Sequence, residues 1–141
     1  MPFQLADLAA SAAADGVVDL IDGGAGAGTI ELWSGAMPAD TTTAPGGSLL
    51  CEITYADPAF GSASAGVATA AGVPLTGTGL AAAGSGTEIG FYRINDSTGT
   101  TIWQNDTVAT SGSSGLVLNT TSVSEGVDIE ITAHTYTQPT T

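Results

Sequence analysis

The chain has 141 residues, and 14 acidic side chains against one basic side chain, Arg93, give it a formal net charge of −13. Nucleic-acid binding needs several Lys or Arg side chains against phosphate groups, so this composition argues against a nucleic-acid partner. An anionic membrane surface would repel the chain for the same reason, and no apolar run reaches the roughly 18 residues of a transmembrane helix. The length suits one domain with a modest core.

The excess of acidic residues also indicates a salt-rich setting. A large net charge destabilises a compact state through self-repulsion. At molar salt the Debye length falls to about 3 Å, and that repulsion largely vanishes. The composition therefore favours a marine or halophilic source.

Residues 4–22 are rich in alanine, and their larger apolar residues recur at spacings of three and four. This periodicity predicts a helical segment. We expect an interruption near Asp15–Gly16, where Asp15 would cap a second short helix that Gly23 ends. On this basis residues 1–22 form an N-terminal helical arm, and residues 23–141 form a single β-sandwich domain.

The stretch GGAGAG at residues 23–28 has the glycine density of a phosphate-binding loop. A dinucleotide-binding loop follows a strand and opens a helix, however, and here the helical segment comes first. The chain also has no lysine to reach a phosphate. We interpret the stretch as a helix C-cap followed by a flexible link to a strand.

After residue 28 the sequence consists of short β-type segments separated by turns rich in Pro, Gly and Thr. Residues 74–86 predict an irregular edge, and Ser97–Gly99 predict a hairpin turn. About seven short strands with regular turn signals predict a mainly β fold, an antiparallel β-sandwich behind an N-terminal helical segment. The expected strands cover residues 29–34, 49–55, 66–73, 88–96, 100–106, 115–123 and 127–137.

Two of these strands carry expectations about burial. The segment 88–96 is apolar on both faces and should be central. The last segment alternates, which should place Val127, Ile129, Ile131 and Ala133 inward and leave His134 on the outward, solvent-facing side. Cys51, the single cysteine, has apolar neighbours and should be a buried thiol.

The residues that carry chemistry are too scattered to predict an enzyme. One His and one Cys cannot build a structural zinc site in a monomer. A Ser-His-Asp triad would need His134, which the alternation places at the surface. We therefore predict no catalytic residues and no cofactor, with calcium at the loop 95–99 as the open alternative. Arg93 could pair with a carboxylate on a neighbouring strand or reach across a subunit boundary.

Four stretches in combination resemble small virion structural proteins of tailed bacteriophages and tailed archaeal viruses. They are LIDGGAGAGTIELWSGAMPA, GSLLCEITYADPAFGSASAGVATA, FYRINDSTGTTIWQ and LVLNTTSVSEGVDIEITAHTYTQP. The resemblance covers about residues 18 to 138. It implies a head decoration or cement protein that is made in the host cytoplasm and works on the particle surface. It implies no catalytic residues.

The expected partners are the major capsid protein or another virion protein, together with further copies of the chain in a dimer or trimer. The N-terminal segment carries more apolar residues than a helix covering one sandwich edge requires, so it is the expected docking arm. The alternative function is a tail-tip or fibre module that recognises host-surface glycans. The candidate interface residues are Leu5, Leu8, Val17, Ile21 and Arg93.

Overall fold

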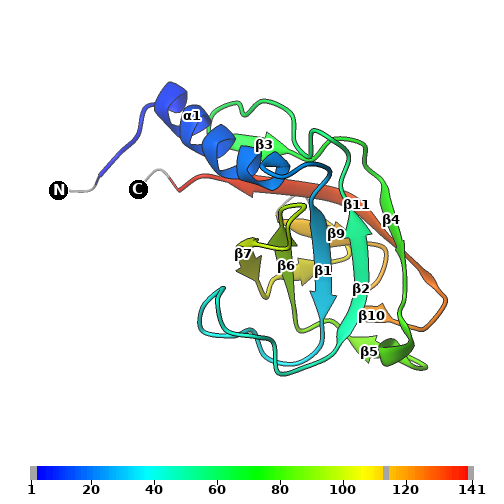
Figure 1. The fold of residues 1–141 in the computed structure, drawn as a ribbon. Coiled ribbons are helices and arrows are strands. Elements are labelled where there is room, and N and C mark those ends of the chain that lie inside the picture. Colours follow the sequence, from blue (N-terminus) through cyan, green and yellow to red (C-terminus); the bar gives the residue numbers. More distant parts are fainter. Residues whose placement is uncertain (1–2, 113–114, 140–141) are drawn as a thin grey trace.

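The computed structural model describes residues 3–112 and 115–139, which form a helix laid against strands in several antiparallel sheets (Figure 1). Strands make up 37% of the chain and helices 14%, so the predicted mainly β fold with an N-terminal helix is confirmed. The helical elements are α1 (Asp7–Val18) and the 3-10 helices η1 (Asp19–Asp22) and η2 (Ala81–Ala83). The described strands are β1 (Thr29–Trp33), β2 (Leu49–Thr54), β3 (Val67–Thr69), β4 (Leu75–Thr78), β5 (Thr87–Glu88), β6 (Phe91–Asn95), β7 (Thr101–Asn105), β8 (Val108–Ala109), β9 (Leu116–Leu118), β10 (Ser122–Val123) and β11 (Asp128–Thr137).

The strands form two larger sheets and one small one. The first sheet has the order β2-β1-β6-β7, and the second has the order β3-β11-β9-β8 with β4 also paired to β11. Strands β10 and β5 make a separate pair. The structure has more strands than the sequence predicts. Strands β4 and β8 lie in stretches that resemble loops, and the predicted segments 88–96 and 115–123 are each divided, into β5 with β6 and into β9 with β10. Strands β4, β5, β8 and β10 have two to four residues each.

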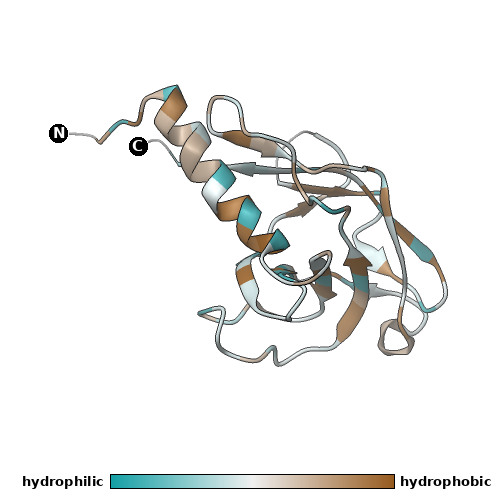
Figure 2. Cartoon of the chain, turned by 45° about the horizontal axis from the view of Figure 1, so that its top comes forward, coloured by the Kyte–Doolittle hydropathy of each residue, from teal (hydrophilic) through white to brown (hydrophobic). Residues whose placement is uncertain are grey.

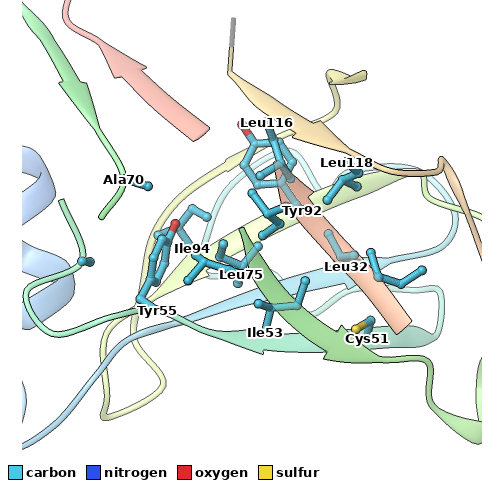
Figure 3. Close-up of a cluster of buried hydrophobic side chains, with 14 of the residues drawn as sticks. Leu32, Cys51, Ile53, Tyr55, Ala70, Leu75, Tyr92, Ile94, Leu116 and Leu118 are labelled. Carbon is cyan, nitrogen blue, oxygen red and sulfur yellow. The ribbon is translucent and has the colours of Figure 1, made fainter. Parts of the chain in front are cut away.

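One buried core joins the two larger sheets. Tyr92 and Ile94 come from the first sheet, and Leu116 and Leu118 come from the second (Figure 3). Cys51 belongs to the same core and is fully buried, as predicted.

Strand β6 occupies the centre of the first sheet, between β1 and β7, and all five of its residues are buried. The predicted hairpin joins it to β7. In the turn, one carboxylate oxygen of Asp96 accepts hydrogen bonds from the backbone N–H groups of Thr98 (2.8 Å) and Thr100 (3.0 Å). Gly99 adopts φ +87°, which side-chain-bearing residues rarely take. The central position and the hairpin are both confirmed.

Helix α1 runs through Asp15 and Gly16 without the predicted interruption. A glycine inside a helix costs about 1 kcal/mol, which is offset because the helix buries Ala10, Ala14 and Val18. Asp15 does not cap a second helix; its carboxylate accepts a hydrogen bond of 2.7 Å from the backbone N–H of Ala63. The helical segment ends at Gly23, as predicted.

The glycine-rich link then leads from η1 into β1, which confirms the predicted order of helix before strand. A side chain at Gly28 would collide with Ile21 and with the carbonyl of Asn95, and one at Gly24 would collide with Ser97. The close approach of the link to the β6–β7 hairpin therefore explains these two glycines.

The alternation predicted for the last strand is wrong at both ends. Val127 lies before β11 and is 53% exposed, whereas His134 is only 1% exposed. The register between β11 and β9 shifts between Ile131 and Ala133. An extra residue of this kind reverses which side chains face the core in the rest of the strand. His134 therefore points inward.

Candidate functional site

An aromatic cluster surrounds His134 where the two larger sheets meet. The centroid of the His134 ring lies 5.2 Å from that of Phe60, 5.9 Å from that of Tyr55 and 6.2 Å from that of Tyr92. Trp103, on β7, lies 6.3 Å from His134 by the same measure. The cluster thus joins side chains from both sheets and from the segment that follows β2.

Two hydrogen bonds fix the His134 ring. Nδ1 lies 3.1 Å from the carbonyl oxygen of Gly115, and a carbonyl only accepts, so Nδ1 carries the proton. Nε2 then accepts from the Tyr55 hydroxyl, 2.8 Å away. Burial lowers the pKa of His134 to about 4, against the opposing effect of the Gly115 hydrogen bond. His134 is therefore a neutral residue of the interior, and its burial keeps it from acting on a substrate in solvent.

A surface cleft of about 350 Å³ adjoins this cluster. Its walls come from β6 and β7 on one side and from the second half of β11 on the other. The lining side chains are aromatic, hydroxyl or amide groups, without a charged residue. The lining residues are Tyr92, Trp103, Asn105, Gly115, Thr135, Tyr136 and Thr137.

The aromatic walls of the cleft are held by packing behind them. The rings of Trp103 and Tyr136 have centroids 5.2 Å apart and planes inclined by 48°. Behind Trp103 lies Phe60, with a centroid distance of 6.4 Å. The Tyr136 hydroxyl donates a hydrogen bond of 3.2 Å to the side-chain oxygen of Gln138. Burial raises the pKa of Tyr92 to about 12, so this phenol stays protonated at neutral pH.

Sequence reasoning missed this cleft. The sequence around Trp103 is typical of an ordinary core or edge residue. Tyr136 lies in the part of the last strand, beyond Ile131, where the prediction of inward and outward side chains is wrong. The two residues are far apart in sequence, and only the packing of the two larger sheets brings their rings into contact. The useful signal was the aromatic content of the segments 101–105 and 128–137.

The structure does not gather the five predicted interface residues into one surface. Leu8 is 84% exposed, and Leu5 and Val17 are half-buried. Ile21 and Arg93 lie inside the fold. The interface prediction therefore remains for the first three residues, because a partner cannot reach the other two in this structure.

The hydrogen bonds of the Arg93 guanidinium end on neutral oxygens rather than on a neighbouring carboxylate. Nε donates to the side-chain oxygen of Gln104 at 3.0 Å, and Nη2 donates to the backbone carbonyls of Thr43 and Asp40. Gln104 in turn donates to the carbonyl of Pro38 at 2.8 Å. Arg93 thus attaches the loop between β1 and β2 to the first sheet.

Three apolar side chains of the N-terminal segment are exposed: Phe3 before α1, Leu8 at the start of α1 and Leu20 in η1. Phe3 is 70% exposed, Leu8 is 84% exposed and Leu20 is 55% exposed. Figure 2 shows hydrophobic residues at both ends of the helix, with paler alanines between them. The opposite side of α1 packs on β3 and β11. The segment thus buries one side and presents another to solvent.

The described residues contain neither a cluster of possible metal ligands nor a long apolar helix. Within residues 3–112 and 115–139, no three His, Cys, Asp or Glu side chains gather where they could hold a metal ion. The carboxylate of Asp96, in the loop considered for calcium, accepts hydrogen bonds from that loop. No helix in the same residues is long and apolar enough to cross a membrane.

No family model, curated protein or solved structure matches the chain.

Proposed function

We propose that the chain is a non-enzymatic structural protein of a tailed-virus particle, where it decorates or cements the capsid. The proposal rests on the resemblance over residues 18 to 138 and on one structural observation. That observation is the exposure of three apolar side chains along the N-terminal segment, Phe3, Leu8 and Leu20.

Half of the four acidic side chains in this segment are held by the chain itself. Two of its acidic side chains turn toward the chain's own backbone: Asp15 accepts from Ala63, and Asp22 accepts from Ala59 at 3.0 Å. Asp7 and Asp19 stay exposed to solvent. In a chain with a net charge of −13, an interface is least costly where few like charges face a partner.

Docking would also stabilise the domain. A partner that binds only the folded form raises the free energy of unfolding by mass action. The partner that fits is the apolar, neutral part of a capsid surface, with the chain seated there as a dimer or trimer.

A double variant tests the docking surface. Phe3→Ser with Leu8→Ser removes two exposed apolar side chains, so the melting temperature should stay unchanged while attachment to particles stripped of the protein falls. Val127→Ser is the matched control, since Val127 is also exposed and the turn before β11 lies away from α1 (Figures 1 and 2). Co-sedimentation measures occupancy. Full occupancy by the double variant would contradict docking through this segment.

The second candidate is a tail-tip or fibre module that recognises host-surface glycans, which the aromatic cleft favours. The two candidates differ in copy number. A decoration protein is present in hundreds of copies per particle, whereas a tail module is present in a few. Quantifying the band of this protein in purified particles against the major capsid band decides between them.

A further inference from the structure

We propose that the cleft between β7 and β11 is a binding site for a neutral saccharide, with a pyranose ring packed on Trp103 and Tyr136. The site belongs to the isolated chain, so it does not depend on the protein's position in a particle. Its support comes from the charge, shape and hydrogen-bonding groups of the cleft.

The lining offers no partner of opposite charge to a charged ligand. None of the seven lining residues is acidic or basic, although the chain carries 14 acidic side chains. An anionic ligand would meet no cation in the cleft and would be repelled by the net charge of −13. A cationic ligand would meet no carboxylate there. A neutral ligand fits this surface.

The aromatic groups select a ligand with an apolar face. Trp103 and Tyr136 are half-buried, and their inclined rings form two adjoining walls. The C–H face of a pyranose can pack on such rings, while its hydroxyl groups stay at the rim. Binding costs less when the site is already ordered, and the packing of Trp103 on Phe60 and His134 holds this wall in place.

The polar groups supply partners for hydroxyls. The Asn105 side-chain oxygen accepts from the backbone N–H of Thr107 at 2.7 Å, which orients the amide. In the described part of the chain, its Nδ2 group donates to no protein acceptor, so it can donate to a ligand. Thr137, which is exposed, also lines the cleft and carries a hydroxyl. A ligand with hydroxyls beside an apolar face is better matched than a wholly apolar one.

The size of the cleft sets the size of the ligand. Small-molecule sites run from about 300 to 1,000 Å³, and this cleft, at about 350 Å³, is near the lower limit. It suits one or two sugar units, and because it opens at the surface, a longer glycan could extend from it.

The test uses the full-length protein and a panel of simple sugars. The probes are the methyl glycosides of glucose, galactose and mannose, N-acetylglucosamine, lactose and maltose. Trp33→Phe leaves Trp103 as the remaining tryptophan, so its fluorescence reports on the cleft. We expect a saturable fluorescence change with at least one probe in the millimolar range and matching saturation-transfer NMR signals. No saturation with any probe would overturn the proposal.

Two cleft variants locate the binding. Asn105→Asp keeps the acceptor for Thr107 but removes the amide donor, and we expect at least about tenfold weaker binding from it. Trp103→Ala should abolish the NMR signals, and far-UV circular dichroism checks that this variant is folded. If Trp103→Ala is unfolded, the affinity of Asn105→Asp tests the site. Unchanged affinity in folded variants would contradict the site. Tighter binding of glucuronic acid or N-acetylneuraminic acid would contradict a neutral ligand.

Discussion

At the scale of single residues, His134 links the two larger sheets. It lies on β11 of the second sheet, and its ring contacts Tyr92 and Trp103 of the first. Its two hydrogen bonds reach the Tyr55 hydroxyl and the carbonyl of Gly115. The bond from Tyr55 requires the neutral form, because a protonated Nε2 could not accept from that hydroxyl, whereas Nδ1 can donate to Gly115 in either form. The histidine that the sequence places at the surface is thus a constituent of the core.

The burial of His134 predicts acid sensitivity. Its pKa is about 4 in the folded protein against 6.5 as the ordinary value. Below pH 6.5 the unfolded chain therefore binds a proton that the folded chain does not, and stability falls as the pH drops toward about 4. The total loss is about 3 kcal/mol. Denaturant unfolding across this window measures it.

The variant His134→Gln removes the titrating ring, so its free energy of unfolding should vary less with pH over the same range. Hydrogen bonds lower the pKa of two carboxyl groups, that of Asp40 mainly through Thr42 and that of Asp96 mainly through Thr98. The stability that these carboxylates contribute is therefore lost only as the pH falls below their ordinary pKa of 3.8. Their contribution is lost at a lower pH than that of His134. Equal pH dependence in the variant and the natural protein would mean that another group causes the effect.

Cys51 carries a second residue-scale prediction. Burial raises the pKa of its thiol to about 11, and the nearby charges of Glu52 and Asp128 act in the same direction. The thiolate is the reactive form, so labelling of the native protein by a thiol reagent should be slow. The same reagent should label the denatured protein quickly. Fast stoichiometric labelling without denaturant would contradict the packing of β2.

At the scale of elements, Arg93 predicts the behaviour of the loop between β1 and β2. Arg93→Lys keeps the charge but loses the planar fork that reaches Gln104 and the loop carbonyls. We expect a loss of about 1–3 kcal/mol in the free energy of unfolding. Amide hydrogen exchange in residues 36–48 should become faster, and mass spectrometry of peptic fragments measures this.

The matched control is Glu31→Gln, because Glu31 lies opposite Arg93 in the register of β1 and β6. Its carboxylate accepts a hydrogen bond from Trp33 at 2.9 Å, and glutamine retains an acceptor there. We expect a change within about 0.5 kcal/mol. If Glu31→Gln were as costly as Arg93→Lys, an ion pair across the strands would explain Arg93 better.

The same scale shows what sequence could predict. Strands with a strong apolar pattern, such as β2, β6 and the first half of β11, were predictable because burial dictates their residues. The register shift after Ile131 was not, since one extra residue leaves no mark in composition. Short strands such as β4 are stabilised by pairing to β11 rather than by their own residues. The cleft arises from two strands distant in sequence, so local patterns could not place it.

At the scale of the whole molecule, charge is the dominant feature. Thirteen uncompensated negative charges repel one another within a small domain. Added salt screens that repulsion, so the melting temperature should rise from about 0.1 M to 3 M sodium chloride. Differential scanning calorimetry along this series measures the effect. A flat melting temperature would show that self-repulsion contributes little to stability.

Strand β11 has a consequence for how the protein is made. It pairs with β3, β4 and β9, so it connects three segments that precede it in the chain. The second sheet lacks the strand that pairs with β3, β4 and β9 until residue 137 has left the ribosome. Until then Leu116 and Leu118 on the nascent chain lack their β11 partner. This sheet can therefore be completed only after β11 has been synthesised. A chain released before β11 would expose apolar surface to the quality-control machinery of the cell.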